Sequence, residues 1–350
     1  MLDLRLTDDE ACRALRAWDV GELLAFPGER GGTANPAVVL DATAGRFFLK
    51  RRNPRYSAPE VLRHDHALLA HLAAAGLPTP VARTTRGGEQ WSATDEGVYE
   101  LYPYLPGAAH DPTSEAQVRQ AGRALARFHE ATHDFAPPPG KAWPRYHDPE
   151  HTLDALTWAL GELADRDKPT PGGRRPEEAR AEIGELLELT RDLAASFPSA
   201  AYSACEHVTV HGDWHPGNVK YRGSEVAGIF DLDWATRQPK LVDLADGVVF
   251  FAGLRPTPLD PADIRSLTQP FELSPERTGA FLAGYGEVAG AAAPDLPRLP
   301  QFMQARWLWC RADPMRRKVP RAEAIDFLLD GLWPPLLCLR QTDPSHTPVA

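Results

Sequence analysis

The sequence predicts an α+β protein with two lobes, a small N-terminal lobe built on an antiparallel sheet (residues 1–103) and a larger, mainly helical lobe (residues 104–350). Short runs of β-forming residues occupy the first hundred positions. Helical periodicity dominates after the turn-forming Pro106-Gly107 pair. A chain of 350 residues is long enough for two lobes with sizeable cores.

The small lobe is predicted to contain strands and one helix. "PAVVLDA" and "RFFLKRR" are expected to be strands joined by a short Thr-Ala-Gly connection. A helix is predicted over 58–75, because apolar residues recur at helical spacing before Gly76 and Pro78. "PVARTTRGGEQWSA" and "GVYELYPYL" are predicted to be two further strands around a Gly-Gly turn.

The larger lobe is predicted to hold amphipathic helices and one isolated hairpin. Helices are expected over 114–132, 151–165 and 176–197, and the first of them opens with a Ser-x-x-Gln capping signal. The segments "NVKY" and "VAGIF" flank a short polar turn and predict an antiparallel hairpin. The last ninety residues are again mostly helical in pattern.

Composition and charge exclude several classes of function. The net charge of −10 argues against nucleic acid as a main partner, because phosphate backbones are bound by clusters of Lys and Arg. No uninterrupted apolar run is long enough to predict a membrane span. The four cysteines are scattered and the N-terminus lacks the pattern of a signal peptide, so we expect reduced thiols and a cytoplasmic protein. The sequence contains no heptad repeat, so it does not predict an oligomeric state.

The segment "VTVHGDWHPGN" (208–218) concentrates polar side chains around three turn-forming residues. His211 and His215, four residues apart with an acid between them, have the spacing of a zinc motif on a helix. Gly212, Pro216 and Gly217 are incompatible with a regular helix, and no third ligand is evident. A zinc site is therefore the less favoured interpretation.

The predicted hairpin suggests a different metal site. Asn218 begins its first arm and Asp231 follows its second arm, so antiparallel pairing brings both to one open end. Asp213 precedes the first arm across a turn and can fold over that end. Few, hard oxygen ligands suit Mg²⁺. This is the arrangement of a phosphotransferase, in which Asp213 accepts the proton of an acceptor hydroxyl while Asn218 and Asp231 hold Mg²⁺.

The spacing of His211, Asp213 and Asn218 equals that of the protein-kinase catalytic loop. The whole loop resembles the His-Gly-Asp-x-His-x-x-Asn motif of the aminoglycoside phosphotransferase/choline kinase superfamily, and "GIFDLDWA" and "LVDLADG" resemble its next two motifs. The resemblance covers roughly 25 to 250. It implies a protein-kinase-like fold, ATP and Mg²⁺ as cofactors, and a small-molecule hydroxyl acceptor. The Gly-Gly-x-x-Asn and Asp-Leu-Asp-Trp segments favour the homoserine-kinase-like or sugar-kinase-like branch.

The resemblance also implies the nucleotide side of the site. Gly31 and Gly32 belong to the expected nucleotide loop, where they admit the phosphates, and Lys50 is expected to hold them. Asp65 occupies the position of the acidic partner of Lys50, with Glu60 as the other candidate.

The segment "ELYPYLPG", which begins with Glu100 and includes Tyr102, is expected to contact the adenine. On the acceptor side, Trp214, Arg306 and Trp309 are candidates, with core packing as the alternative for the two that lie near the C-terminus.

Four further residues are expected to support the loop. The resemblance implies that His211 hydrogen-bonds the loop and that His215 stabilises it or lies near the substrate. It implies that Asp243 supports the loop from beneath, and an ordinary helix N-cap is the alternative. Asp233 is either a metal-side group or a solvated residue after a strand.

Two other function classes remain open from the sequence. One is a catalytically silent, nucleotide-binding pseudokinase. The other is a metal-dependent phosphatase in which Asp231, in its Asp-x-Asp pair with Asp233, is the nucleophile.

Overall fold

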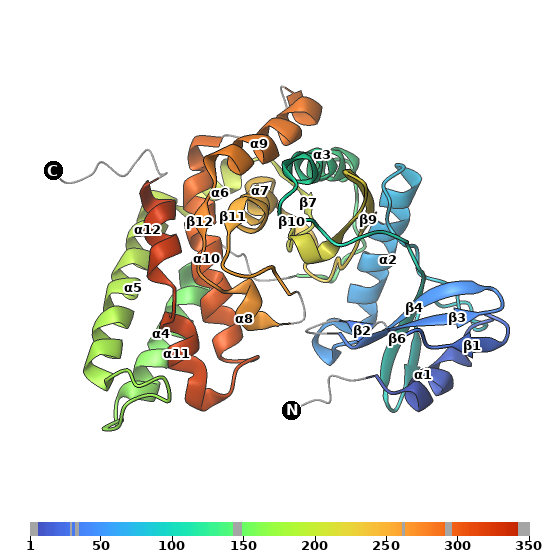
Figure 1. The fold of residues 1–350 in the computed structure, drawn as a ribbon, viewed down its shortest axis with the longest axis horizontal. Helices are drawn as coiled ribbons and strands as arrows, with labels where there is room; N and C mark the ends of the chain where they lie inside the picture. The colour runs from blue at the N-terminus through green and yellow to red at the C-terminus, as the bar shows by residue number, and fades with distance from the viewer. Residues whose placement is uncertain are drawn as a thin grey trace.

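The computed structural model describes residues 6–28, 30–31, 35–142, 149–260, 263–290 and 296–341. Figure 1 shows the predicted α+β architecture, with a sheet-containing N-terminal lobe beside a larger helical lobe. The placement of the domain boundary at 103/104 stays a prediction. Within the described ranges, no helix has the length and apolar character that crossing a membrane requires.

The small lobe is a six-stranded antiparallel sheet. Its strand order is β1-β3-β4-β6-β5. Strand β2 pairs with the first residues of β3, on the side of β3 that faces away from β4. The strands are β1 (Leu23–Ala25), β2 (Arg30–Gly31), β3 (Ala37–Ala42), β4 (Gly45–Arg52), β5 (Ser92–Thr94) and β6 (Gly97–Pro103). The lobe also contains α1 (Asp8–Leu15), η1 (Pro54–Tyr56) and α2 (Pro59–Ala74).

The β3–β4 hairpin and α2 are confirmed as predicted, and α1 is an addition. Helix α1 begins after Thr7, whose side chain accepts a hydrogen bond from the Glu10 N–H. Ala11 and Leu15 of this helix pack with fully buried Val38 and Leu49 to form the core of the lobe. This core fixes β4, which pairs with β3 on one side and with β6 on the other.

The prediction of a strand over most of 80–93 is wrong. Only Ser92–Thr94 pairs with β6, and the preceding residues run as an irregular segment. Pro78 and Pro80 have no N–H to donate to a sheet. The Arg83 N–H reaches the Leu101 carbonyl at 2.7 Å, which holds the segment against β6 without forming a strand.

The larger lobe is mainly helical. Its helices are α3 (Glu115–Ala131), α4 (Pro149–Leu163), α5 (Pro176–Ser196), α6 (Ser199–Ala204), α7 (Leu241–Gly247), the π-helix η3 (Val248–Ala252), α8 (Ile264–Leu267), α9 (Pro275–Ala289), α10 (Leu299–Met315), α11 (Ala324–Leu329) and α12 (Trp333–Gln341), with the short 3₁₀ turns η2 (Pro216–Asn218), η5 (Leu296–Arg298) and η6 (Arg321–Glu323). The predicted helices over 114–132, 151–165 and 176–197 correspond to α3, α4 and α5. Helices α3 and α9 cross closely at Gly122. A Cβ at this residue would lie only 2.1 Å from the Phe281 carbonyl oxygen, so the crossing requires glycine.

The described part of this lobe contains three strand pairs, where the sequence predicted one hairpin. The predicted hairpin is β8 (Val219–Arg222) with β9 (Glu225–Ile229). The additional pairs are β7 (His207–Val210) with β10 (Thr236–Pro239), and β11 (Gly253–Leu254) with β12 (Glu272–Leu273). The β7–β10 pair matters for function because β7 leads directly into the 208–218 motif.

Candidate active site

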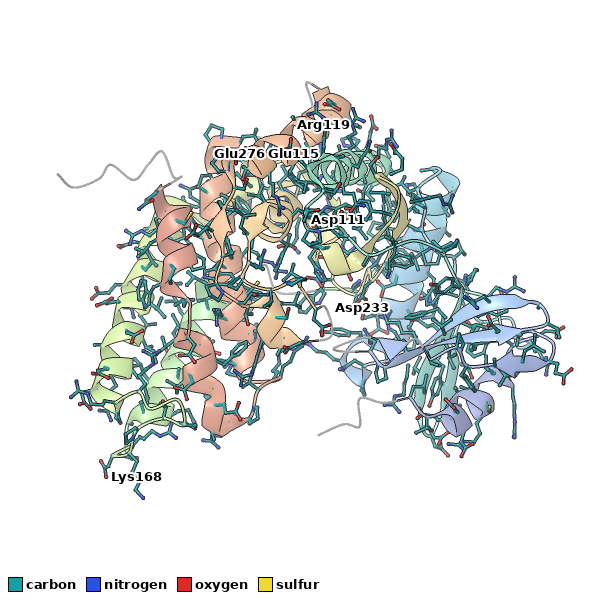
Figure 2. The ribbon with its side chains drawn as sticks, in the orientation of Figure 1. Asp111, Glu115, Arg119, Lys168, Asp233 and Glu276 are labelled. Atoms are coloured by element: carbon teal, nitrogen blue, oxygen red, sulfur yellow. The ribbon has the colours of Figure 1, made fainter. Side chains whose placement is uncertain are left out.

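A cavity of about 500 Å³ lies between the two lobes and is lined by residues of both. Lys50 and Tyr102 line it from the sheet, and Asp213, Asn218 and Asp231 line it from the helical lobe. Figure 2 labels Asp233, another lining residue, in the region where the lobes face each other. The structure therefore brings residues from distant parts of the sequence to one cavity.

The loop after β7 is held from beneath by one carboxylate. Asp243 is fully buried and accepts hydrogen bonds from the His211 N–H and the Gly212 N–H, both at 2.7 Å. A ring nitrogen of His129 lies 2.9 Å from the same carboxylate. Asp243 lies inside the first turn of α7, so its position is not that of an N-cap. The side chain orients the loop backbone, as the supporting role requires.

His211 is a buried scaffold. Its Nε2 lies 2.9 Å from the Phe230 carbonyl oxygen, and its Nδ1 accepts the Asp213 N–H at 3.3 Å. These contacts fit a neutral ring that is protonated on Nε2. Burial lowers the pKa of His211, which favours the same neutral form. Both ring nitrogens are thus used inside the loop.

Gly212 is required where the loop passes the segment after Asp231. Its φ is +79°, and a Cβ there would lie 2.5 Å from the Trp234 carbonyl oxygen. Only glycine combines this left-handed conformation with so close a backbone approach. The two polar segments of the site are therefore packed against each other at this residue.

Asp213 faces the cavity and is held by its neighbours. The Asn218 Nδ2 donates to its carbonyl oxygen at 2.9 Å, and the Arg306 Nη2 donates to Oδ1 at 3.0 Å. The His215 Nε2 lies 3.4 Å from Oδ2. Burial alone would raise the pKa of Asp213, but His215 and Arg306 outweigh it and hold that pKa well below its usual range. The carboxylate is therefore ionised at neutral pH.

The hairpin brings the two expected metal ligands together. The Phe230 N–H donates to the Asn218 carbonyl at 3.0 Å, and Val219 pairs with Ile229, so Asn218 and Asp231 lie at the same end. With Nδ2 bound to Asp213, the Asn218 atom suited to a cation is Oδ1. Asp231 has a φ of +61°, a conformation that Asp tolerates better than most residues.

This donor set fits Mg²⁺ better than Zn²⁺. One amide oxygen and one carboxylate are hard ligands that leave room for water and phosphate oxygens. Among the described residues, no group of three or more His, Cys, Asp or Glu side chains is arranged to hold a metal. His215 accepts the Gly217 N–H through Nδ1 at 3.0 Å, so it stabilises the turn.

Lys50 is held by two carboxylates of the segment after β9. Its Nζ lies 2.9 Å from Asp233 Oδ1 and 3.1 Å from Asp231 Oδ1. Burial alone would lower the pKa of Lys50, but Asp231 and Asp233 outweigh it and raise that pKa. The expected pairing of Lys50 with α2 is wrong in this structure. Glu60 is exposed, and Asp65 binds other cations.

Asp65 pairs with Arg52, two residues after Lys50 on β4. The Arg52 Nη2 donates to Asp65 Oδ2 at 2.8 Å, and its Nη1 lies 2.9 Å from Asp233 Oδ1. Glu100 is fully buried beneath them, 2.7 Å from the His66 Nε2, and it does not line the cavity. Its side chain neutralises buried cations, and the expected contact of the "ELYPYLPG" backbone with the adenine stays a prediction.

Asp233 lines the cavity wall but is buried, so it is not a solvated residue after a strand. Beyond Lys50 and Arg52, its Oδ2 accepts a hydrogen bond of 2.6 Å from the Asn35 Nδ2. Asn35 also accepts the Asn53 N–H at 2.8 Å, so it ties the end of the glycine-containing loop to β4. Gly31 lies in β2 beside Ala37, and Gly32 lies outside the described residues.

The acceptor-side candidates divide into two groups. Arg306 and Trp309 of α10 line the cavity, and Arg306 is also ion-paired with fully buried Asp246. Trp214 is fully buried and packs against His211 and Phe128, so its predicted place near the acceptor is wrong. Its side chain belongs to the core beneath the loop.

Sequence reasoning missed several residues of this site, namely Asn35, Arg52, Lys141 and Asp246. Two of them carried a usable signal. Arg52 follows Lys50 by two residues, which puts both side chains on the same face of a strand. Asn35 ends the Gly-Gly-x-x-Asn segment, which the sequence made recognisable, but nothing near it in the sequence indicated Asp233 as its partner. Lys141 and Asp246 gave no local signal.

A family model described as the phosphotransferase enzyme family matches residues 28–289, which is most of the chain and includes every cavity residue named above except Arg306 and Trp309. The chain belongs to the phosphotransferase enzyme family. Homoserine kinases are among its curated relatives. It is 31% identical over 247 residues to a homoserine kinase of Chelativorans sp. (strain BNC1), covering 69% of this chain and 68% of that protein. A homoserine kinase of Bradyrhizobium sp. is 26% identical over 68% of this chain and 66% of that protein.

Solved structures of the phosphotransferase family share the fold. Amicoumacin kinase hAmiN, in complex with AMP-PNP, Ca²⁺ and Ami, superimposes with a TM-score of 0.65 at 14% identity, covering 96% of this chain and 95% of that one. Spectinomycin phosphotransferase APH(9)-Ia, in complex with ADP and spectinomycin, gives a TM-score of 0.62 at 15% identity, covering 92% and 94%. The protein-kinase-like fold is thereby confirmed, and the protein is a small-molecule kinase. Family membership also disfavours the phosphatase interpretation of Asp231.

Proposed function

We propose that the protein transfers the γ-phosphoryl group of Mg·ATP to a hydroxyl group of a small molecule. One observation carries the proposal. Asp213, an ionised carboxylate, shares a cavity of about 500 Å³ with Lys50, Asn218 and Asp231, the residue types that phosphoryl transfer needs.

The chemistry divides among these side chains. Lys50 binds nucleotide phosphates once they compete for its ammonium group, and Tyr102 borders the same cavity, where we place the adenine. Asn218 and Asp231 would hold Mg²⁺, which supplies charge neutralisation at the β- and γ-phosphates when bound. Asp213 orients the acceptor hydroxyl and takes its proton as the phosphoryl group moves in line.

The low pKa of Asp213 is consistent with this role. A weakly basic carboxylate does not ionise an alcohol in advance, but it can position the hydroxyl and accept the proton late in a loose transition state. His215 and Arg306, which lower the pKa, also fix both carboxylate oxygens at the cavity wall. Positioning is therefore the main contribution we assign to Asp213.

A coupled ADP-release assay with a panel of acceptors tests the proposal. Homoserine comes first, because curated relatives bear that name, followed by amino sugars, aminoglycosides, choline and simple polyols. We expect one class to stimulate ADP release and Asp213→Asn to abolish the stimulation. Mg·ATP binding without stimulation by any acceptor would instead indicate a pseudokinase.

A further inference from the structure

The loop between α3 and α4 sends a lysine into the contact between the two lobes. The Lys141 Nζ donates to Asp65 Oδ1 at 2.5 Å and to the Leu232 carbonyl oxygen at 2.9 Å. Asp65 belongs to α2 of the small lobe, whereas Leu232 stands between Asp231 and Asp233. One ammonium group therefore connects α2 with the segment that carries the expected metal ligand.

The connection continues through the other oxygen of Asp65. Arg52 donates to Asp65 Oδ2 at 2.8 Å and lies 2.9 Å from Asp233 Oδ1. We name Lys141, Asp65 and Arg52 the cross-lobe relay. Its two ends meet the same short segment, Lys141 at the Leu232 carbonyl and Arg52 at the Asp233 carboxylate. The relay thus holds that segment at two points, with α2 as the support.

The neighbouring backbone shows that this contact is built into the packing. Gly140 has a φ of +109°, and a Cβ at this residue would lie 2.8 Å from the Cβ of Glu60 in the first turn of α2. The loop therefore rests on α2 at Gly140, and Lys141 reaches the acid further along the same helix. A glycine at this point allows both the backbone conformation and the close approach.

Burial makes the relay sensitive to the loss of a single member. The side chain of Lys141 is 0% exposed, and those of Arg52 and Asp65 are 2% and 3% exposed. Burial lowers the pKa of Lys141, and Asp65 opposes that shift. A buried charge whose partner is removed loses far more than an exposed pair does. Removal of Lys141 leaves the Leu232 carbonyl and one Asp65 oxygen without this donor.

We propose that Lys141 is a positioning residue that sets the Leu232 backbone, and through it the Asp231 carboxylate, for binding of the divalent cation and nucleotide. The proposal rests on the proposed function for the identity of these ligands. Lys141 does not contact the reacting atoms itself. It acts directly on the segment from Asp231 to Asp233 through the Leu232 carbonyl, and on β4 through Asp65 and Arg52.

The test uses Lys141→Met, which keeps the aliphatic stem and removes the charge and donors, and Lys141→Arg, which restores both. Lys168→Met is the matched control, because Lys168 is an exposed lysine at the far tip of the α4–α5 connection (Figure 2). Mn²⁺ binding in the presence of AMP-PNP is measured by electron paramagnetic resonance. Binding of AMP-PNP without metal, and kcat and KM in the coupled assay, are measured on the same samples.

We expect Lys141→Met to weaken Mn²⁺ binding by about tenfold or more, in line with the loss of a group that orients a metal ligand. Binding of AMP-PNP without metal should change less than threefold. Lys141→Arg should recover most of the Mn²⁺ affinity, and Lys168→Met should equal the wild type. A folded Lys141→Met protein with wild-type Mn²⁺ affinity would overturn the proposal, as would equal losses in Lys141→Met and Lys141→Arg.

Two further outcomes separate this proposal from the proposed function. If Lys141→Met does not fold, Lys141→Gln, which keeps one donor for the Leu232 carbonyl, should show a smaller but measurable loss of Mn²⁺ affinity, and an unchanged affinity would refute the relay. If the wild type binds Mn²⁺ and AMP-PNP but phosphorylates no acceptor, the function fails while the resonance measurement still decides the relay. Normal turnover in the wild type with an unaffected Lys141→Met refutes the relay alone.

Discussion

The catalytic loop (residues 211–218) and the cross-lobe relay are both networks of buried polar groups, but they are organised differently. In the loop, Asn218 binds the carbonyl of Asp213, five residues away, and His211 binds Phe230, 19 residues away. In the relay, Lys141 binds Leu232 across 91 residues and Asp65 across 76. The loop is held within the helical lobe, by these short-range contacts and by Asp243 and Arg306, whereas the relay joins the two lobes.

This difference suggests a division of labour. In the proposed function, Asp213 serves the acceptor side from a loop that the helical lobe holds, mainly through Asp243. Lys50 and the relay serve the nucleotide side and depend on both lobes. Changes in the loop should therefore act on the chemical step, and changes in the other network should act on binding of nucleotide and metal.

The largest expected effect is that of Asp213→Ala. The variant should lower kcat by at least about 10²-fold while the affinity for ATP stays near wild type, because the proton is accepted only in the transition state. Single-turnover kinetics and ATP titration measure the two quantities. Asp134→Ala is the control, since that side chain is 95% exposed. If the affinity for ATP fell as much as kcat, the proposed division between a loop for the chemical step and a relay for nucleotide binding would be contradicted.

A second large effect is expected for Lys50→Ala. Removal of the ammonium group leaves Asp231 and Asp233 without their shared cation and removes a phosphate ligand. We expect kcat/KM for ATP to fall on the order of 10- to 100-fold, with a raised KM contributing to the loss. Steady-state kinetics with varied ATP measures this. Normal kinetics in this variant would mean that the small lobe has been assigned the wrong role.

Asp65→Asn should lower stability by an amount that depends on pH. Burial would raise the pKa of Asp65, but Lys141, His64 and Arg52 lower it to about 2. The carboxylate therefore contributes stability that is fully present above its ordinary pKa near 4 and is lost as pH falls towards about 2. We expect a difference in the free energy of unfolding of about 2 kcal/mol at pH 7 that narrows below about pH 4.

Urea unfolding of the wild type and the variant at a series of pH values measures that difference. A gap that stays constant down to the lowest pH at which both proteins fold would contradict the ion-pair origin of the effect. That result would mean that the lost stability comes from packing around the amide that Asp65→Asn introduces.

The smallest expected effect is that of Arg306→Gln, which should change the loop network and leave the relay intact. Arg306→Gln removes one of the groups that lower the pKa of Asp213, so that pKa should rise. Because the carboxylate also loses the donor that fixes its Oδ1, kcat should fall by up to about tenfold while the KM for ATP changes little. An unchanged kcat would show that Arg306 serves Asp246 and the fold only.

The local features of this protein could be predicted from its sequence. The strands flanking Thr43 to Gly45, the helix over 58–75 and the β8–β9 hairpin follow from short-range periodicity and turn signals. The hairpin alone was enough to bring Asn218 and Asp231 to one end. Gly212 indicated a loop that is not helical, and this argued against a zinc site formed by the two histidines.

The remaining features required the fold. The short strand β7 is a run of β-forming residues, but its partner β10 is polar, ends in proline and shows no alternating pattern. Trp214 follows the catalytic acid directly, yet its side chain turns into the core beside Phe128. Asp65 stands near the position expected for a partner of Lys50, but Arg52 lies between them and binds it instead. Such choices among several nearby acids and cations depend on distances of a few ångströms that spacing along the chain does not specify.

The central claim is that Asp213 directs the γ-phosphoryl group of Mg·ATP to an acceptor hydroxyl in the shared cavity. Phosphorus NMR of complete reactions with the acceptor that stimulates ADP release tests this most directly. We predict a new phosphomonoester resonance that appears in step with ADP, requires the divalent cation, and is lost with Asp213→Asn. ADP with free inorganic phosphate and no phosphomonoester, or an undiminished product signal from Asp213→Asn, would contradict it.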